Sequence, residues 1–116
     1  MAGTANIRKM YMGQPSTTAQ TLYTAPSNTV NQPSPYATAV IKDIYLANTT
    51  SSPQFIILGI NGIGVSNQLI PTQTIAANTL VPVTGLNKAL SASDFISAMQ
   101  GTSGAITVFI DGIEVQ

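Results

Sequence analysis

The chain has 116 residues, of which 44% are hydrophobic and only 7% are charged, and its four basic and four acidic residues cancel. This length predicts one domain with a buried core, and the balanced charge argues against a nucleic-acid partner and against a polybasic membrane patch. The sequence holds no Cys and no His, which excludes a disulfide framework and removes the commonest metal ligands and general bases.

Residues 1–20 are polar, and we expect them to form an extended N-terminal arm. Basic residues occur there without a following apolar run, so the segment does not match a secretory signal peptide. One alternating stretch, 7–12, can form a strand. The longest apolar stretch of the chain, 55–65, is broken by Asn61 and is shorter than the ~20 residues that a membrane-spanning helix needs. We place the folded domain at 21–116.

Short strands and turn residues alternate through the first half of that domain. A strand at 21–26 ends at a proline, and a loop rich in Asn, Ser and Pro covers 27–36. Strands are predicted at 54–60 and 63–70, on either side of an Asn-Gly pair, which is the strongest short hairpin signal. Regular spacing of this kind is typical of a β-sandwich or barrel.

The longest predicted strand, 37–48, contains a Lys-Asp step in its middle. Its apolar side chains stay on one face only if one residue is inserted at this step. Lys42-Asp43 is therefore predicted to be a β-bulge, in which two residues stand opposite one. The pair is interpreted as strand geometry with exposed charge, and not as a catalytic site.

The last predicted strand, 105–116, shows a similar change of parity. Its apolar residues switch faces at Asp111-Gly112, which predicts a second bulge with glycine at a positive φ. This interpretation places Ile113 and Val115 in the core and Glu114 on an outward face. Two long strands with bulges at matching positions favour a bent or closed sheet over a flat one.

The segment between these strands is less regular. A strand is predicted at 73–83 with a break at Ala77-Asn78, and another at 94–99. A short helix within 86–100 remains an alternative, because three apolar residues could line a turn or two there. The predicted fold is an all-β antiparallel sandwich or jelly-roll-like barrel with an extended N-terminal arm.

Little in the sequence predicts catalysis. The four carboxylates could supply a glycosidase pair in principle, but their positions at bulges, before a strand and on an outward face favour structural roles. They are not spaced as in a calcium-binding loop. No catalytic residue, metal ligand or cofactor is predicted, and the chain is expected not to be an enzyme. The carboxylates are Asp43, Asp94, Asp111 and Glu114.

Two segments are candidates for contact with partner proteins. The arm combines basic, aromatic and thioether side chains, and we expect it to pair with the sheet edge of a neighbouring molecule; the alternative is that it covers an edge of its own sheet. The Pro-rich loop is a second candidate, although it could be a plain connector. The arm residues are Ile7, Arg8, Lys9, Met10, Tyr11 and Met12, and the loop residues are Asn31, Pro33, Pro35 and Tyr36.

Three stretches resemble a family of small β-sandwich virion proteins of tailed bacteriophages. They are "TLYTAP", "TAVIKDIYLANTT" and "ITVFIDGIEV", and the loop at 27–36 and the arm are longer than the family pattern. The positions that fit are Leu22, Tyr23, Thr24 and Pro26, then Thr38, Ala39, Ile41, Lys42, Ile44, Leu46, Asn48 and Thr49, and finally Gly112 and Glu114.

The resemblance implies a structural component of a phage virion, assembled in the host bacterial cytoplasm. A capsid decoration or cement protein is favoured, which would bind the major capsid protein or other virion proteins and further copies of itself as a homo-oligomer, with no nucleic-acid or membrane partner. A neck, tail or baseplate protein of the same particle is one alternative. A carbohydrate-binding module for host attachment is another, although the sequence contains no Trp.

Overall fold

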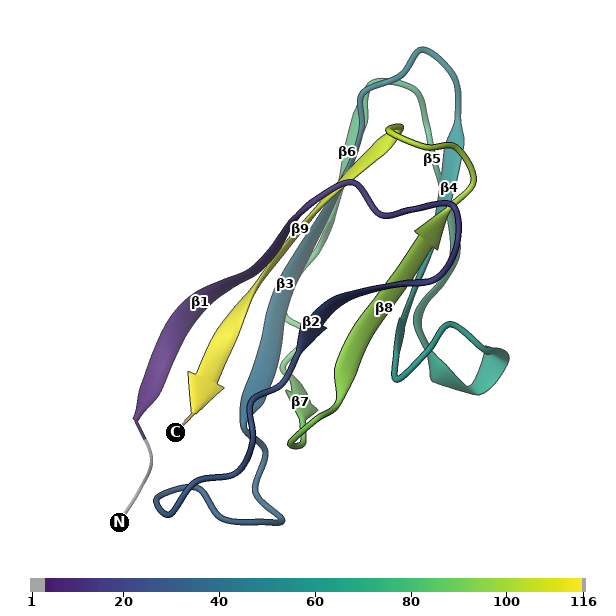
Figure 1. Cartoon of the computed structure of the whole chain (residues 1–116). Helices are drawn as coiled ribbons and strands as arrows, with labels where there is room; N and C mark the ends of the chain where they lie inside the picture. The colour runs from purple at the N-terminus through teal and green to yellow at the C-terminus, as the bar shows by residue number, and fades with distance from the viewer. Residues whose placement is uncertain (1–3, 116) are drawn as a thin grey trace.

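The computed structural model describes residues 4–115, which contain nine β-strands and one short 3₁₀ turn. In chain order these are β1 (Ala5–Gly13), β2 (Gln20–Thr24), β3 (Ala39–Asn48), β4 (Gln54–Ile60), η1 (Val65–Asn67), β5 (Gln68–Ile75), β6 (Thr79–Val83), β7 (Lys88–Leu90), β8 (Phe95–Gln100) and β9 (Ile106–Val115) (Figure 1).

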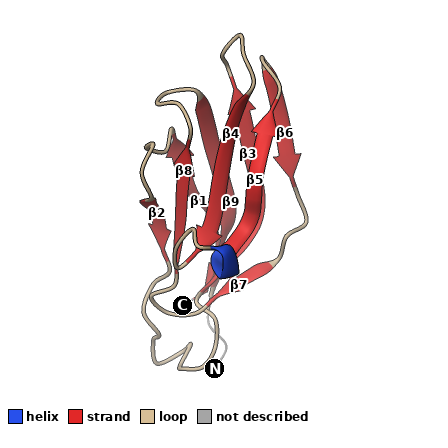
Figure 2. Cartoon of the chain, turned by 90° about the vertical axis from the view of Figure 1, so that its right-hand side faces the viewer, coloured by secondary structure: helices blue, strands red, loops and turns tan. Residues whose placement is uncertain are grey.

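The strands form two antiparallel sheets packed face to face. A five-stranded sheet has the order β1-β9-β3-β6, with β7 pairing the first half of β3 on the same side as β6. A four-stranded sheet has the order β2-β8-β4-β5 and lies in front in Figure 2. The predicted all-β antiparallel sandwich is confirmed.

The core lies between the two sheets and is built from alternate positions of their long strands. In β9, for example, every second residue is buried and those between are half-buried or exposed, as expected for a strand with one face on a core. The largest fully buried apolar side chains are Ile41, Ile44, Leu46, Ile56, Leu58, Ile75, Leu90, Ile96, Ile106, Val108 and Ile110.

Two buried amides fix the loops at one end of the sandwich. Asn48 Nδ2 donates to the carbonyl oxygens of Ser52 (2.9 Å) and Ile75 (3.0 Å). Gln100 Nε2 donates to the Pro15 carbonyl at 2.7 Å, and its Oε1 accepts from the Ile106 N–H at 2.7 Å. Because buried polar groups must be paired, Gln100 binds the β1–β2 connection to the core, and Asn48 binds the β3–β4 loop to the end of β5.

The N-terminal segment pairs with the chain's own sheet. Strand β1 runs antiparallel to β9 along its whole length, so the alternative of an arm that covers its own edge is the one observed. Residues 1–3 lie outside the described part of the chain. The backbone of β9 is thereby paired on both sides, by β1 and by β3.

The bulge predicted in β3 is confirmed. Ile41 pairs with Gly112 and Asp43 with Asp111, so Lys42 is the extra residue. Its carbonyl oxygen accepts from the Leu86 N–H at 3.0 Å, and its ammonium donates to the side chain of Asn87. Asp43 Oδ1 accepts from the Gly85 N–H at 3.1 Å. The bulge thus anchors the crossover from β6 to β7.

The bulge predicted in β9 is wrong. Inward and outward residues alternate along β9 without interruption. The bulge lies instead in the neighbouring strand β1, where Met10 is the extra residue. Gly112 faces inward at an ordinary φ, and a Cβ built on it would lie 2.4 Å from Met10 Cε. Met10 therefore fills the space that a larger residue at 112 would need. Ile113 and Val115 consequently face outward, and Glu114 faces inward.

The predicted strand at 63–70 is replaced by the turn η1 followed by β5. The strand predicted at 94–99 is confirmed as β8, and the alternative of a short helix within 86–100 is not observed. Asn61 and Gly62 both have positive φ, as the hairpin signal requires, but they begin a longer loop that ends at Gln68. The predicted break near Asn78 is confirmed, since β5 and β6 belong to different sheets.

Candidate interaction face

The outward side of the five-stranded sheet carries two cross-strand rows of apolar side chains. We call this surface the five-strand face. Strand register places Ile7, Ile113, Val40 and Ala89 side by side in one row, and Met12, Phe109, Tyr45 and Pro82 in the other.

These rows are unusual for a sheet surface that meets water, where outward positions are normally polar. Ile7 is 91% exposed and Met12 is 60% exposed, and Leu80 farther along the same face is 55% exposed. The residues between the edges are half-buried by their neighbours in each row. Apolar side chains exposed in this way make the five-strand face a candidate interaction surface.

A charged row separates the two apolar rows. Lys9, Asp111 and Asp43 stand opposite one another across β1, β9 and β3. Like charges directly opposite on neighbouring strands destabilise a sheet. The bond to the Gly85 N–H gives Asp43 a role in the fold, but no such bond explains Asp111 within residues 4–115. This charged row is a second reason to treat the five-strand face as a candidate for contact with a partner.

The outward side of the four-stranded sheet has no such charged row, and its side chains cover one another more completely. A Cβ built on Gly101 would lie 2.2 Å from Phe55 Cε1, so the ring of Phe55 lies over this glycine. Ser97, at the centre of β8, is only 3% exposed. The five-strand face therefore leaves more apolar surface open to a partner.

A buried carboxylate fastens β1 and β2 to the end of β9. Glu114 is 7% exposed and accepts hydrogen bonds from the Tyr23 hydroxyl and from Arg8 Nη1, the latter at 3.3 Å. Tyr23 belongs to the four-stranded sheet, so this network joins the two sheets. Burial raises the pKa of Tyr23, the hydrogen bond to Glu114 and its negative charge raise it further, and Arg8 lowers it.

This network predicts a pH dependence of stability. The raised pKa means that the folded state holds the phenolic proton more tightly than the unfolded chain does. The stabilisation is therefore complete below the ordinary value of 10.0 and is lost as the pH rises above it. Tyr23→Phe should cost about 1.5 kcal/mol near neutral pH.

Urea unfolding of wild type and Tyr23→Phe between neutral pH and about pH 11 tests this expectation, with Tyr36→Phe as the control on an exposed tyrosine. The stability difference between wild type and Tyr23→Phe should shrink above the ordinary tyrosine pKa. A difference that stays constant across this range would contradict the role given to the phenol.

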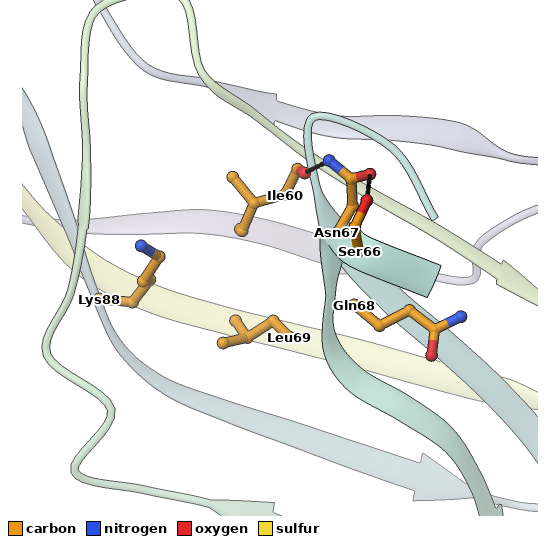
Figure 3. A pocket seen from close by; sticks show the side chains of 6 residues that line it. All are labelled: Ile60, Ser66, Asn67, Gln68, Leu69 and Lys88. Carbon is orange, nitrogen blue, oxygen red and sulfur yellow. Dashed lines mark hydrogen bonds between the residues drawn. The ribbon is translucent and has the colours of Figure 1, made fainter. Parts of the chain in front are cut away.

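The described residues offer little for ligand or metal chemistry. A shallow pocket of about 260 Å³ lies between β7 and β5, lined by Ile60, Ser66, Asn67, Gln68, Leu69 and Lys88 (Figure 3). Three of its polar side chains bond within the chain: Asn67 Nδ2 donates to the Ile60 carbonyl at 2.8 Å, Ser66 to Asn67 at 3.4 Å, and Gln68 to the Ile63 carbonyl at 3.1 Å. Residues 4–115 contain no cluster of three or more His, Cys, Asp and Glu side chains suited to a metal. Within the same range, no helix has the length and apolarity to cross a membrane.

The predicted contact residues of the arm separate into three groups in the structure. Three of them lie on the five-strand face: Ile7, Lys9 and Met12. Arg8 bonds to Glu114, and Tyr11 is half-buried. Met10 is 7% exposed and belongs to the core, so it offers no surface to a partner. A partner contact for the others stays a prediction.

The predicted contact loop lies at the end of the sandwich where β1 begins and β9 ends (Figures 1 and 2). Its four candidate residues, Asn31, Pro33, Pro35 and Tyr36, are all exposed. Internal hydrogen bonds shape the loop: Asn28 Nδ2 donates to the Tyr36 carbonyl at 3.1 Å, and Gln32 Nε2 to the Ala37 carbonyl at 2.9 Å. The loop's role in binding also stays a prediction.

Sequence reasoning missed the central part of the five-strand face. Strand pairing places Ile113 and Phe109 of β9 opposite Val40 and Tyr45 of β3, on the same outward side of the sheet. The signal was present, because β9 is apolar at both parities, which is typical of a strand covered on both faces. The false bulge at Asp111-Gly112 assigned Ile113 to the core and concealed this pattern.

No protein-family model and no curated protein matches this chain. Among solved structures, a chain described as "Cyanophage Pam1 capsid asymmetric unit" aligns with a TM-score of 0.45 and 12% sequence identity. The alignment covers 98% of this chain and 86% of that chain. This likeness is too distant to establish a shared fold or function.

Proposed function

We propose that the chain is a non-enzymatic structural protein of a tailed-phage virion, and that it binds the major capsid protein lattice as a decoration or cement protein. The observation that carries the proposal is the five-strand face, with its two apolar rows on a protein of zero net charge. The resemblance of three sequence stretches to small phage virion proteins is the reason for proposing a phage particle. No catalytic step and no cofactor form part of this proposal.

The size of the face supports a docking role. Four strands about 4.8 Å apart, with about nine residues rising about 3.3 Å each, give an area of roughly 19 by 30 Å, or about 600 Å². Each partner in a standard complex buries about 800 Å². The face can therefore supply most of one ordinary interface, and the loop at 27–36 or the β1 edge can supply the rest.

The proposed mechanism is passive. A rigid sandwich covers a seam between capsid subunits with its five-strand face, and many symmetric copies add modest contacts into a large avidity. Low surface charge suits close packing, because few ions must be desolvated. In this proposal, copies of the chain contact one another through surfaces other than this face.

Copy number tests the proposal. Quantitative mass spectrometry of purified particles, measured against the major capsid protein, should give a simple fraction of the capsid subunit count. A few copies per particle would indicate a neck or tail protein instead of a capsid decoration protein. Absence from the particle would refute a virion role.

A further inference from the structure

We propose that the surface covered by the five-strand face presents a cationic side chain, Arg or Lys, to the Asp43-Asp111 pair, with apolar groups around it. This inference rests on the proposed function, because it names the chemistry of the capsid surface to which the face docks. It also predicts the sign of the effect of each charge substitution on the face.

The charged row has an excess of negative charge. Asp111 is exposed and makes no hydrogen bond or ion pair within residues 4–115, and Asp43 Oδ1 accepts only the Gly85 N–H. Lys9 stands opposite Asp111 at the edge strand. Lys42, the other nearby cation, is turned to the β6–β7 crossover, where it donates to Asn87. The row thus sets two carboxylates against one ammonium.

The position of the row makes this excess important for binding. Apolar rows flank it on both sides, so a partner that covers Ile113 and Phe109 also covers Asp111, which lies between them in β9. A carboxylate removed from water without a counter-charge is strongly destabilising. A guanidinium or ammonium on the partner compensates for this loss, and the fork of Arg suits two neighbouring carboxylates.

The same reasoning disfavours a second copy of this chain as the occupant. A copy stacked through the same face brings one ammonium, that of Lys9, for two carboxylates. The two joined faces would therefore bury an excess of negative charge. The occupant is therefore a different protein surface, apolar with a central basic group.

The test measures binding of purified variants to particles made without the chain. Asp111→Lys should weaken binding at least about 30-fold, because it removes a pair and sets like charges together. Asp111→Asn should weaken it about tenfold and flatten its dependence on salt. Lys9→Gln should leave binding unchanged or tighten it. Thr72→Lys, exposed on β5 of the other sheet, makes the same change in net charge as Asp111→Asn and should have no effect.

Each contrary outcome has a distinct meaning. Wild-type affinity in Asp111→Lys, or tenfold weaker binding in Lys9→Gln, would overturn the basic partner and leave the docking face itself standing. The wild-type protein could also form a dimer in solution that is lost in Ile113→Lys. This result would show that the face binds a second copy of the chain and would overturn the inference. No binding by wild type, together with absence from native particles, would refute the proposed function as well.

Discussion

Replacement of Ile113 by Lys is expected to abolish docking on the virion while the β-sandwich stays folded. Ile113 lies near the middle of an apolar row, between Ile7 and Val40, and would be covered when the face meets its partner. A lysine there would put an ammonium into the apolar row and beside the partner's basic group, which is expected at Asp111, two residues away on the same face. We expect the affinity to fall at least about 100-fold, or about 2.7 kcal/mol.

The isolated variant should lose only about 1 kcal/mol of stability, because position 113 is outward and half-buried. Ile57→Lys is the matched control, since Ile57 is half-buried on the outward side of the four-stranded sheet. Equilibrium binding to particles and thermal unfolding give the two readings. Undiminished binding in Ile113→Lys, or an equal loss in Ile57→Lys, would argue against the five-strand face.

Gly112→Ala is expected to cause a large loss of stability although it adds only one methyl group. The new Cβ would lie 2.3 Å from the Val40 carbonyl oxygen and 2.4 Å from Met10 Cε. The methionine can move, but the carbonyl belongs to the neighbouring strand of the sheet and cannot. We expect a loss of about 3 kcal/mol, which lowers the Tm by more than about 10 °C.

Gly64→Ala provides the control for this substitution. Gly64 has a φ of −64°, and the nearest atom to a built Cβ is 3.6 Å away, on Asn67. Alanine should be neutral there, or stabilising by up to about 1 kcal/mol. Calorimetry or urea unfolding measures both variants. A Gly112→Ala protein as stable as Gly64→Ala would show that β1 and β3 do not close on Gly112 as described.

The fold class and the β3 bulge could be predicted because the relevant signals are local. Lys42 and Asp43 are the only charged residues of strand β3, and they interrupt the alternation of its inward apolar side chains between Ile41 and Ile44, which marks the bulge. Turn residues such as Asn61 and Gly62 mark a chain reversal by their positive φ. These features depend on a few neighbouring residues and little on the rest of the molecule.

The prediction for strand β9 was wrong because its end buries residues that are usually exposed and turns apolar residues outward. Gly112 and Glu114 face the core, whereas Ile113 and Val115 face outward. What makes this arrangement stable comes from distant residues: Met10 fills the space beside the glycine, and Tyr23 and Arg8 satisfy the carboxylate. Such long-range compensation leaves no periodic signal in the sequence.

The candidate site was predicted only at its edge for the same reason. The arm was recognised from its mixture of basic, aromatic and thioether residues, which drew attention to Ile7 and Met12. The face to which these residues belong becomes visible only when β9 and β3 are set beside β1 in register. Each apolar row consists of residues from four different strands, so no single segment of the sequence contains it.

The most direct measurement is a cryo-EM reconstruction of the virion at a resolution that places the strands of this chain. The account predicts that the five-strand face lies against another virion protein, with a basic side chain of that protein next to Asp111. A map in which this face is open to solvent, with the chain attached through its other sheet or its end loops, would contradict it.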